Sequence, residues 1–121
     1  MRIWIIVGVI SFALAIVLGA FSAHLVKPKL SPADFTIFET GVRYHIYNSL
    51  GLILIGLIGF HVKENIVIIS ALMIITGIIL FSGSLYILVF SDLRWLGAIT
   101  PFGGISLITG WVLLAFNLIR N

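Results

Sequence analysis

The chain of 121 residues has no cysteine and few charged side chains. Without cysteine there is no disulfide, no thiolate nucleophile and no cysteine-ligated zinc or iron–sulfur cluster. Only 9% of the residues are charged, whereas 61% are hydrophobic. A soluble domain of this size would have too little polar surface to cover itself. The composition therefore predicts an integral membrane protein.

The chain also lacks a basic stripe, although its formal net charge is +3. Its lysines and arginines are scattered between apolar runs, whereas nucleic-acid-binding proteins gather them on one face. We therefore expect no nucleic-acid partner and interpret the basic residues as contacts to lipid headgroups at the ends of spans. The basic residues divide almost evenly between the two predicted sides, so they do not fix the orientation in the membrane.

Four apolar runs are long enough to cross a bilayer as helices, since about 20 residues span its hydrocarbon core. The first exceeds the apolar region of about 7–15 residues in a signal peptide, so we interpret it as a retained helix. Short connections make neighbouring helices antiparallel. The predicted fold is a single all-α domain over 1–121, an up-down bundle of four transmembrane helices with both termini on one side. The expected spans are about 3–25, 42–60, 66–90 and 96–119.

Two proline-containing stretches indicate helix starts. Ser31, Pro32 and Asp34 supply an N-cap, a first-position proline and an acidic first turn, which predicts that the second helix begins near Pro32, at the membrane interface. The later stretch "WLGAITPFGG" (residues 95–104) holds Gly97, Thr100 and Pro101. These three residues predict either a helix start or a kink, and the positional preference of proline favours the start.

Small residues recur every four positions in the first predicted helix and again in the fourth. Lipid gives no hydrophobic drive for helix association, so small residues that allow close backbone approach are the main packing signal. We expect them to pack helices within one chain, and a homo-oligomer interface is left open. The predicted packing residues are Ser11, Ala15, Gly19, Ala23, Gly103, Gly104, Ser106 and Gly110.

Most of the polar chemistry gathers where the second helix would enter the bilayer. Glu39 and Arg43 are four residues apart and share a helix face, and Arg43 is near enough to the interface to pair with Glu39 or a lipid phosphate. We interpret the group as an interfacial hydrogen-bonded cluster; a metal site and a proton path are the alternatives. The candidate cluster consists of His24, Glu39, Arg43, Tyr44, His45, Tyr47 and Asn48.

Motifs for catalysis or cofactor binding are missing. The sequence contains no G-x-S-x-G elbow, no Walker motif and no dinucleotide fingerprint, so we expect neither an enzyme nor a cofactor. A transporter usually has inverted repeats with paired broken helices, which a chain of this length supplies only as several copies. A small oligomeric transporter or channel is the main alternative function.

Several of these stretches together resemble one protein family. They are "GAFSAH" (19–24), "TGVRYHIYNSL" (40–50), "GSLYIL" (83–88) and "LGAITPFGG" (96–104), followed by "GW" (110–111). In this order they are similar to the YgdD/YwdK family of small bacterial inner-membrane proteins. The resemblance implies a four-helix membrane protein with no established enzymatic activity. Two positions depart from the family pattern, since Ser22 replaces a glycine and Asn48 replaces a histidine. The second change weakens a proton-relay or metal interpretation.

These observations predict a multi-pass protein of the bacterial cytoplasmic membrane. We expect a structural or lipid-interacting role, with membrane lipids as partners.

Overall fold

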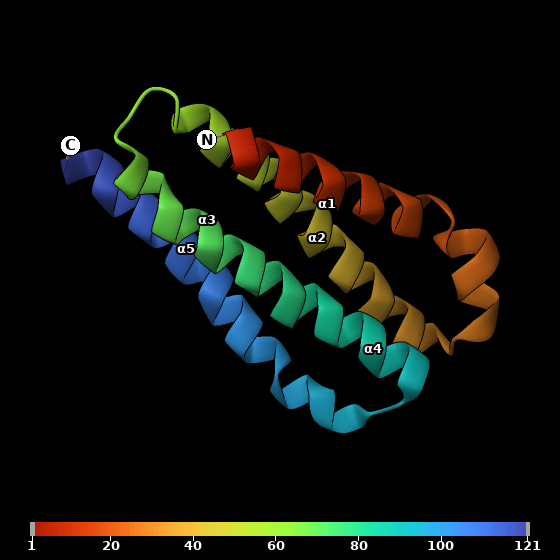
Figure 1. The fold of residues 1–121 in the computed structure, drawn as a ribbon. Coiled ribbons are helices and arrows are strands. Elements are labelled where there is room, and N and C mark those ends of the chain that lie inside the picture. The colour runs from red at the N-terminus through yellow and green to blue at the C-terminus, as the bar shows by residue number, and fades with distance from the viewer. Residues whose placement is uncertain (1, 121) are drawn as a thin grey trace.

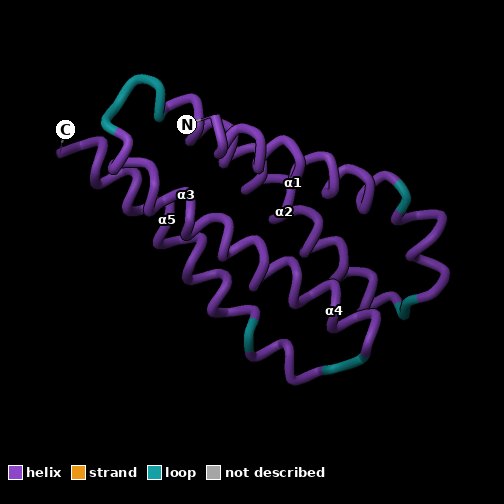
Figure 2. Tube along the Cα trace, viewed as in Figure 1, coloured by secondary structure: helices purple, strands orange, loops and turns teal. Residues whose placement is uncertain are grey.

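The computed structural model describes residues 2–120, which are helical almost throughout (Figures 1 and 2). Short non-helical connections lie at the ends of the bundle (Figure 2). The α-helices are α1 (Arg2–Ala20), α2 (Pro32–Ile58), α3 (Glu64–Ile78), α4 (Ser84–Ser91) and α5 (Thr100–Arg120). The third span, Glu64–Ser91, is continuous, because a π-helical turn, Ile79–Gly83, joins α3 to α4.

The four long apolar helices run alternately up and down (Figure 1). Both chain ends lie at one end of the bundle, together with the connection 59–63, and the other two connections lie at the opposite end. α2 is central, since it packs against α1 on one side and against α3 and α4 on the other, while α5 packs on α3. The predicted fold class is confirmed.

The first connection is itself mostly helical. α1 ends at Ala20, earlier than the expected end near residue 25, because Phe21 leaves helical geometry and a π-helical turn, Ser22–Val26, follows. Its 19 residues still extend about 28 Å, close to the thickness of the hydrocarbon core. α2 begins at Pro32 as the sequence indicates, with the Ser31 side chain accepting a hydrogen bond from the Asp34 backbone N–H at 3.2 Å.

The last connection, residues 92–99 between α4 and α5, is joined to the start of α2 by an ion pair. Arg94 donates two hydrogen bonds to the carboxylate of Asp34, both at 2.9 Å, and a third to Asp92. A bidentate arginine–carboxylate pair fixes both distance and orientation. The last connection is thus linked to the first turn of α2 across a sequence separation of 60 residues.

The segment around Pro101 is a helix start. A 3₁₀ turn, Arg94–Ala98, precedes α5, and Pro101 lies in the first turn of α5, where its missing N–H costs no helical hydrogen bond. The Thr100 hydroxyl lies 2.6 Å from the Ser84 hydroxyl. This hydrogen bond joins the start of α5 to the start of α4.

Most of the first row of small residues packs against α2. Ala15 is fully buried, and a Cβ added to Gly19 would lie 3.2 Å from the Val42 side chain. Ala23 lies in the π-helical turn and is exposed, so it does not belong to this contact. Gly8, which the four-residue spacing did not include, lies even closer, because its added Cβ would be 3.1 Å from the Ser49 carbonyl oxygen.

The second row lets α5 approach the third span. A Cβ on Gly103 would lie 2.3 Å from the Phe81 backbone nitrogen, and one on Gly110 would lie 2.9 Å from Ile74. The Ser106 hydroxyl donates a hydrogen bond of 2.7 Å to the Met73 carbonyl. The small residues here bring backbone against backbone.

Large apolar side chains cover much of the outer surface. Those of Val9, Ile10, Ile69, Ile79 and Ile108 are more than half exposed. Such a surface is unfavourable in water but suits a hydrocarbon medium, in which apolar side chains need no cover.

The two adjacent glycines of α5 give a matched test of this packing. We expect Gly103→Ala to lower the free energy of unfolding by about 1–3 kcal/mol or more, because its methyl group would overlap the Phe81 backbone. Gly104→Ala is the control, since its Cβ would have 3.8 Å of space. Thermal unfolding in detergent measures both. Equal stability of the two variants would contradict the described α5 contact.

Candidate functional site

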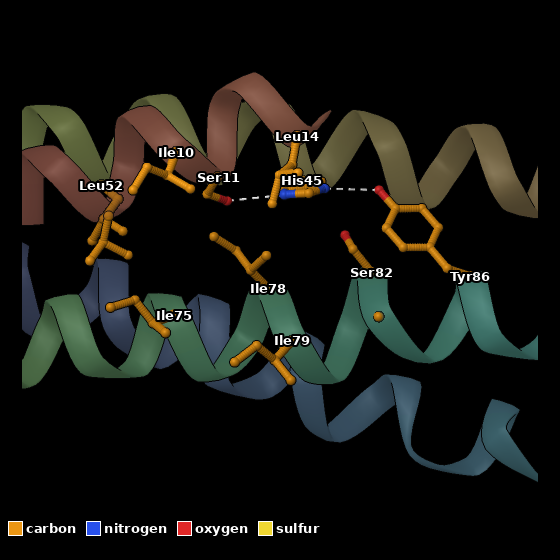
Figure 3. A pocket seen from close by; sticks show the side chains of 12 residues that line it. Ile10, Ser11, Leu14, His45, Leu52, Ile75, Ile78, Ile79, Ser82 and Tyr86 are labelled. Atoms are coloured by element: carbon orange, nitrogen blue, oxygen red, sulfur yellow. Dashed lines mark hydrogen bonds between the residues drawn. The ribbon is translucent and has the colours of Figure 1, made fainter. Parts of the chain in front are cut away.

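The centre of α2 carries a hydrogen-bonded network that reaches two other helices. His45 is 7% exposed. Its Nε2 lies 3.0 Å from the Ser11 hydroxyl of α1, and its Nδ1 lies 3.0 Å from the Tyr86 hydroxyl of α4. Figure 3 shows the imidazole ring between these two hydroxyl groups. Ser11 also bonds the Ser49 hydroxyl at 2.5 Å. One side chain of α2 therefore joins α1 to α4.

The network satisfies its own members. A neutral imidazole has one donor and one acceptor nitrogen, and each hydroxyl both donates and accepts. Serine and tyrosine hydroxyls can therefore fill both ring positions whichever tautomer is present. Buried polar groups need such partners because none is available in hydrocarbon.

Asn48, one turn further along α2, makes the connection to α5. Its Oδ1 accepts a hydrogen bond of 2.9 Å from Trp111 Nε1, and its Nδ2 donates one of 2.9 Å to the Tyr44 carbonyl. An asparagine thus supplies an acceptor to the neighbouring helix and a donor to its own. His45 and Asn48 together link α2 to three other helices.

Ser82 in the π-helical turn makes a further contact with α2. Its hydroxyl donates a hydrogen bond of 2.6 Å to the Gly41 carbonyl. Gly41 allows this approach, because an added Cβ would lie 3.0 Å from the Tyr86 ring. The π turn, a feature often found at functional sites, therefore lies beside the polar network.

The structure separates the predicted cluster into two groups. His45 and Asn48 are buried between helices, whereas Glu39, Arg43 and His24 are exposed. Glu39 and Arg43 do not form the ion pair that their spacing allows; within residues 2–120 the ion pairs are those of Arg94.

The remaining members of the cluster are the two tyrosines. Tyr44 and Tyr47 are 42% and 59% exposed, with ring centroids 6.0 Å apart. His24 lies in the turn after α1, apart from the interior site of His45. Among residues 2–120, no three histidine, aspartate or glutamate side chains are placed to share a metal ion.

Sequence reasoning missed most partners of the buried polar residues. Ser11 was assigned to packing alone, and Ser49, Tyr86 and Trp111 were not included in the cluster. The available signal was the helical spacing of His45 and Ser49, which puts both on one face of α2 and predicts a polar partner opposite. Nothing in the spacing indicates which helix supplies that partner.

A groove of about 430 Å³ lies between α1 and the third span, with α2 as its floor. Its walls are mostly aliphatic, including Ile10, Leu14, Ile75 and Ile79 (Figure 3). Ser11, His45 and Tyr86 line one part of it. Its exposed polar surface is small, because the hydrogen-bonded groups face one another.

The four long apolar helices, the apolar outer surface and the hydrogen bonds that His45 and Asn48 make between helices define a multispan α-helical membrane protein. Comparison with known proteins gives the family. Residues 18–104 match the model described as a protein of unknown function (DUF423). The chain belongs to this family, which agrees with the resemblance found in the sequence.

Relatives match over almost their whole length. A UPF0382 membrane protein of Staphylococcus haemolyticus is 40% identical over 117 residues, covering 97% of this chain and 95% of the relative. The UPF0382 membrane protein YwdK of Bacillus subtilis is 37% identical over 121 residues, covering 99% and 98%. No solved structure matches. The protein is therefore a bacterial membrane protein of a family whose function is unknown.

Removing one hydroxyl tests the His45 network. We expect Tyr86→Phe to lower the free energy of unfolding by about 0.6 kcal/mol, the average for a hydrogen bond between membrane helices, and by at most about 1.7 kcal/mol, because one His45 nitrogen loses its partner. Tyr47→Phe is the matched control, because its hydroxyl bonds no residue of 2–120. Denaturant unfolding in detergent measures the difference. The network would be refuted as a stabilising contact if both variants were equally stable.

Proposed function

We propose that the protein is a structural, lipid-interacting element of the bacterial cytoplasmic membrane, and that it is not an enzyme. The observation that carries this proposal is the apolar groove between α1 and the third span. Its rim is formed by side chains such as Ile10 and Ile79, which are 58% and 64% exposed. In a membrane this surface meets lipid, so the proposed occupant is the acyl chain of a membrane lipid.

The lining of the groove supports a hydrocarbon ligand. Its lining is aliphatic along α1, α2 and α3, and the polar groups at Ser11 and Tyr86 are already bonded to His45. A ligand in this groove would find dispersion contacts but few free hydrogen-bonding groups. This favours binding of hydrocarbon over binding and turnover of a polar substrate.

The alternative is a small transporter or channel assembled from several copies. It would need a polar path across the bilayer. His45, Ser11 and Tyr86 are candidates for such a path, and their mutual hydrogen bonds favour a structural contact between helices instead. Two results together would support the alternative. The protein in liposomes would pass ions or solutes in a way that His45→Leu abolishes, and native mass spectrometry would show that several copies assemble.

Gly83 gives a direct way to fill the groove. It lines the groove, and an added Cβ would meet no atom within 4 Å. We expect Gly83→Leu to reduce crosslinking of the groove by a phospholipid that carries a photoreactive group in its acyl chain. Stability should be unchanged or slightly raised, because leucine is the better helix former. Mass spectrometry of labelled peptides from α1 and α3 measures the crosslinking.

Gly104→Ala is the control, because Gly104 lies outside this groove and its Cβ also has space. It should leave groove labelling unchanged. Labelling of α1 and α3 that is the same in wild type and Gly83→Leu would contradict the proposal.

A further inference from the structure

We propose that Glu39 and Arg43 form a headgroup site for a zwitterionic phospholipid with a primary ammonium group. Both side chains line a cleft of about 210 Å³ beside the end of α1, together with Gly19 and Ser22. The proposal rests on the lipid-interacting role proposed above, but it concerns a different part of the molecule. Arg43 would bind the lipid phosphate and Glu39 the ammonium group.

The first argument is that neither charge has an ion-pair partner among residues 2–120. They are four residues apart on one face of α2, yet neither forms an ion pair within residues 2–120, where the ion pairs are those of Arg94. Asp34 and Asp92, at the same end of the bundle, are already engaged by Arg94. A cation and an anion therefore border the cleft with their charges free for an external ligand.

The second argument is the depth of the two charges. α2 has 27 residues, a length of about 40 Å, which exceeds the hydrocarbon core by about 10 Å, or roughly seven residues. The excess lies at the start of α2, since its other end is wholly apolar from Leu50 to Ile58. Counting from Pro32, the boundary falls near Glu39. Arg43 then lies about 6 Å deeper, where a cation is favoured only beside an anion or when its side chain extends back to the interface.

The third argument is that apolar side chains line the cleft beside the two charges. Phe38, Val42 and Ile46 line it together with the two charged residues. A phospholipid presents the same sequence of groups, with charges at the boundary and hydrocarbon below. The Ser22 hydroxyl donates to the Gly19 carbonyl at 2.7 Å, so the ionic contacts would come chiefly from Glu39 and Arg43.

The two charges make separable demands on the ligand. All phospholipids carry the phosphate that Arg43 would bind. Among ethanolamine, choline and glycerol headgroups, only ethanolamine offers Glu39 a cation that also donates hydrogen bonds. A trimethylated ammonium has no N–H to donate, and a glycerol headgroup donates only from uncharged hydroxyls. The site should therefore prefer phosphatidylethanolamine to phosphatidylcholine and to phosphatidylglycerol.

The experiment is native mass spectrometry of the full-length protein in detergent with these three lipids, all having the same acyl chains. Wild type should retain phosphatidylethanolamine in preference to phosphatidylcholine. Arg43→Gln should weaken both by about tenfold, the loss expected for a hydrogen bond to a charged group. Glu39→Gln should weaken phosphatidylethanolamine alone and abolish the preference. Arg43→Lys should keep most of the binding because it keeps the charge.

Lys63→Gln and Glu64→Gln are the matched controls, since they remove the same charges from exposed positions at the other end of the bundle. They should leave the preference unchanged, and thermal unfolding should show that all variants fold. Any of three results would overturn the proposal. Wild type binds the three lipids equally, the control variants lose the preference, or inorganic phosphate displaces the lipid.

Gly83→Leu separates this site from the groove. It should reduce groove labelling while leaving the headgroup preference intact. Wild type that is labelled in the groove but shows no headgroup preference would refute the headgroup site alone. Wild type that shows the headgroup preference but no groove labelling would refute the groove alone.

Discussion

A polar side chain within the membrane is costly unless it finds a partner inside the protein, and the arrangement of the helices depends on this constraint. α2 meets this constraint for its neighbours as well as for itself. His45 bonds Ser11 of α1 and Tyr86 of α4, and Asn48 accepts from Trp111 of α5. In water such bonds would compete with solvent, but in hydrocarbon the competing partners are absent. Hydrogen bonds from one helix therefore set the positions of the other three spans.

Small residues make these hydrogen bonds geometrically accessible. The Ser11 hydroxyl is short and reaches His45 and Ser49 because Gly8 and Ala15 allow α1 to lie close to α2. On the other side, Gly103 brings α5 against the backbone of the π-helical turn. Packing and hydrogen bonding are thus coupled, since a bulkier residue in either contact would separate the polar groups as well as the helices.

The sequence predicted those features that local physics determines. Hydrophobic length gave the number of spans, and the cap at Ser31 with Pro32 gave the start of α2. The partners of His45 could not be predicted from the sequence. They lie 34 and 41 residues away, and helical spacing defines a face but not the helix that packs on it. The pairing of Glu39 with Arg43 that their spacing allows is absent for a related reason. Spacing permits a contact, but an exposed pair gains too little energy to hold two long side chains together.

The segment 38–54 changes character along its length because it crosses two environments. Where α2 extends beyond the hydrocarbon and just inside it, charged side chains can face outward, and Glu39 and Arg43 do so. One turn deeper, outward charges would be costly, so the polar groups His45, Asn48 and Ser49 turn inward. The helical repeat provides both arrangements in one continuous helix, since these two sets lie on different faces. A single element can therefore hold the bundle together from within and still present an ionic surface at the membrane boundary.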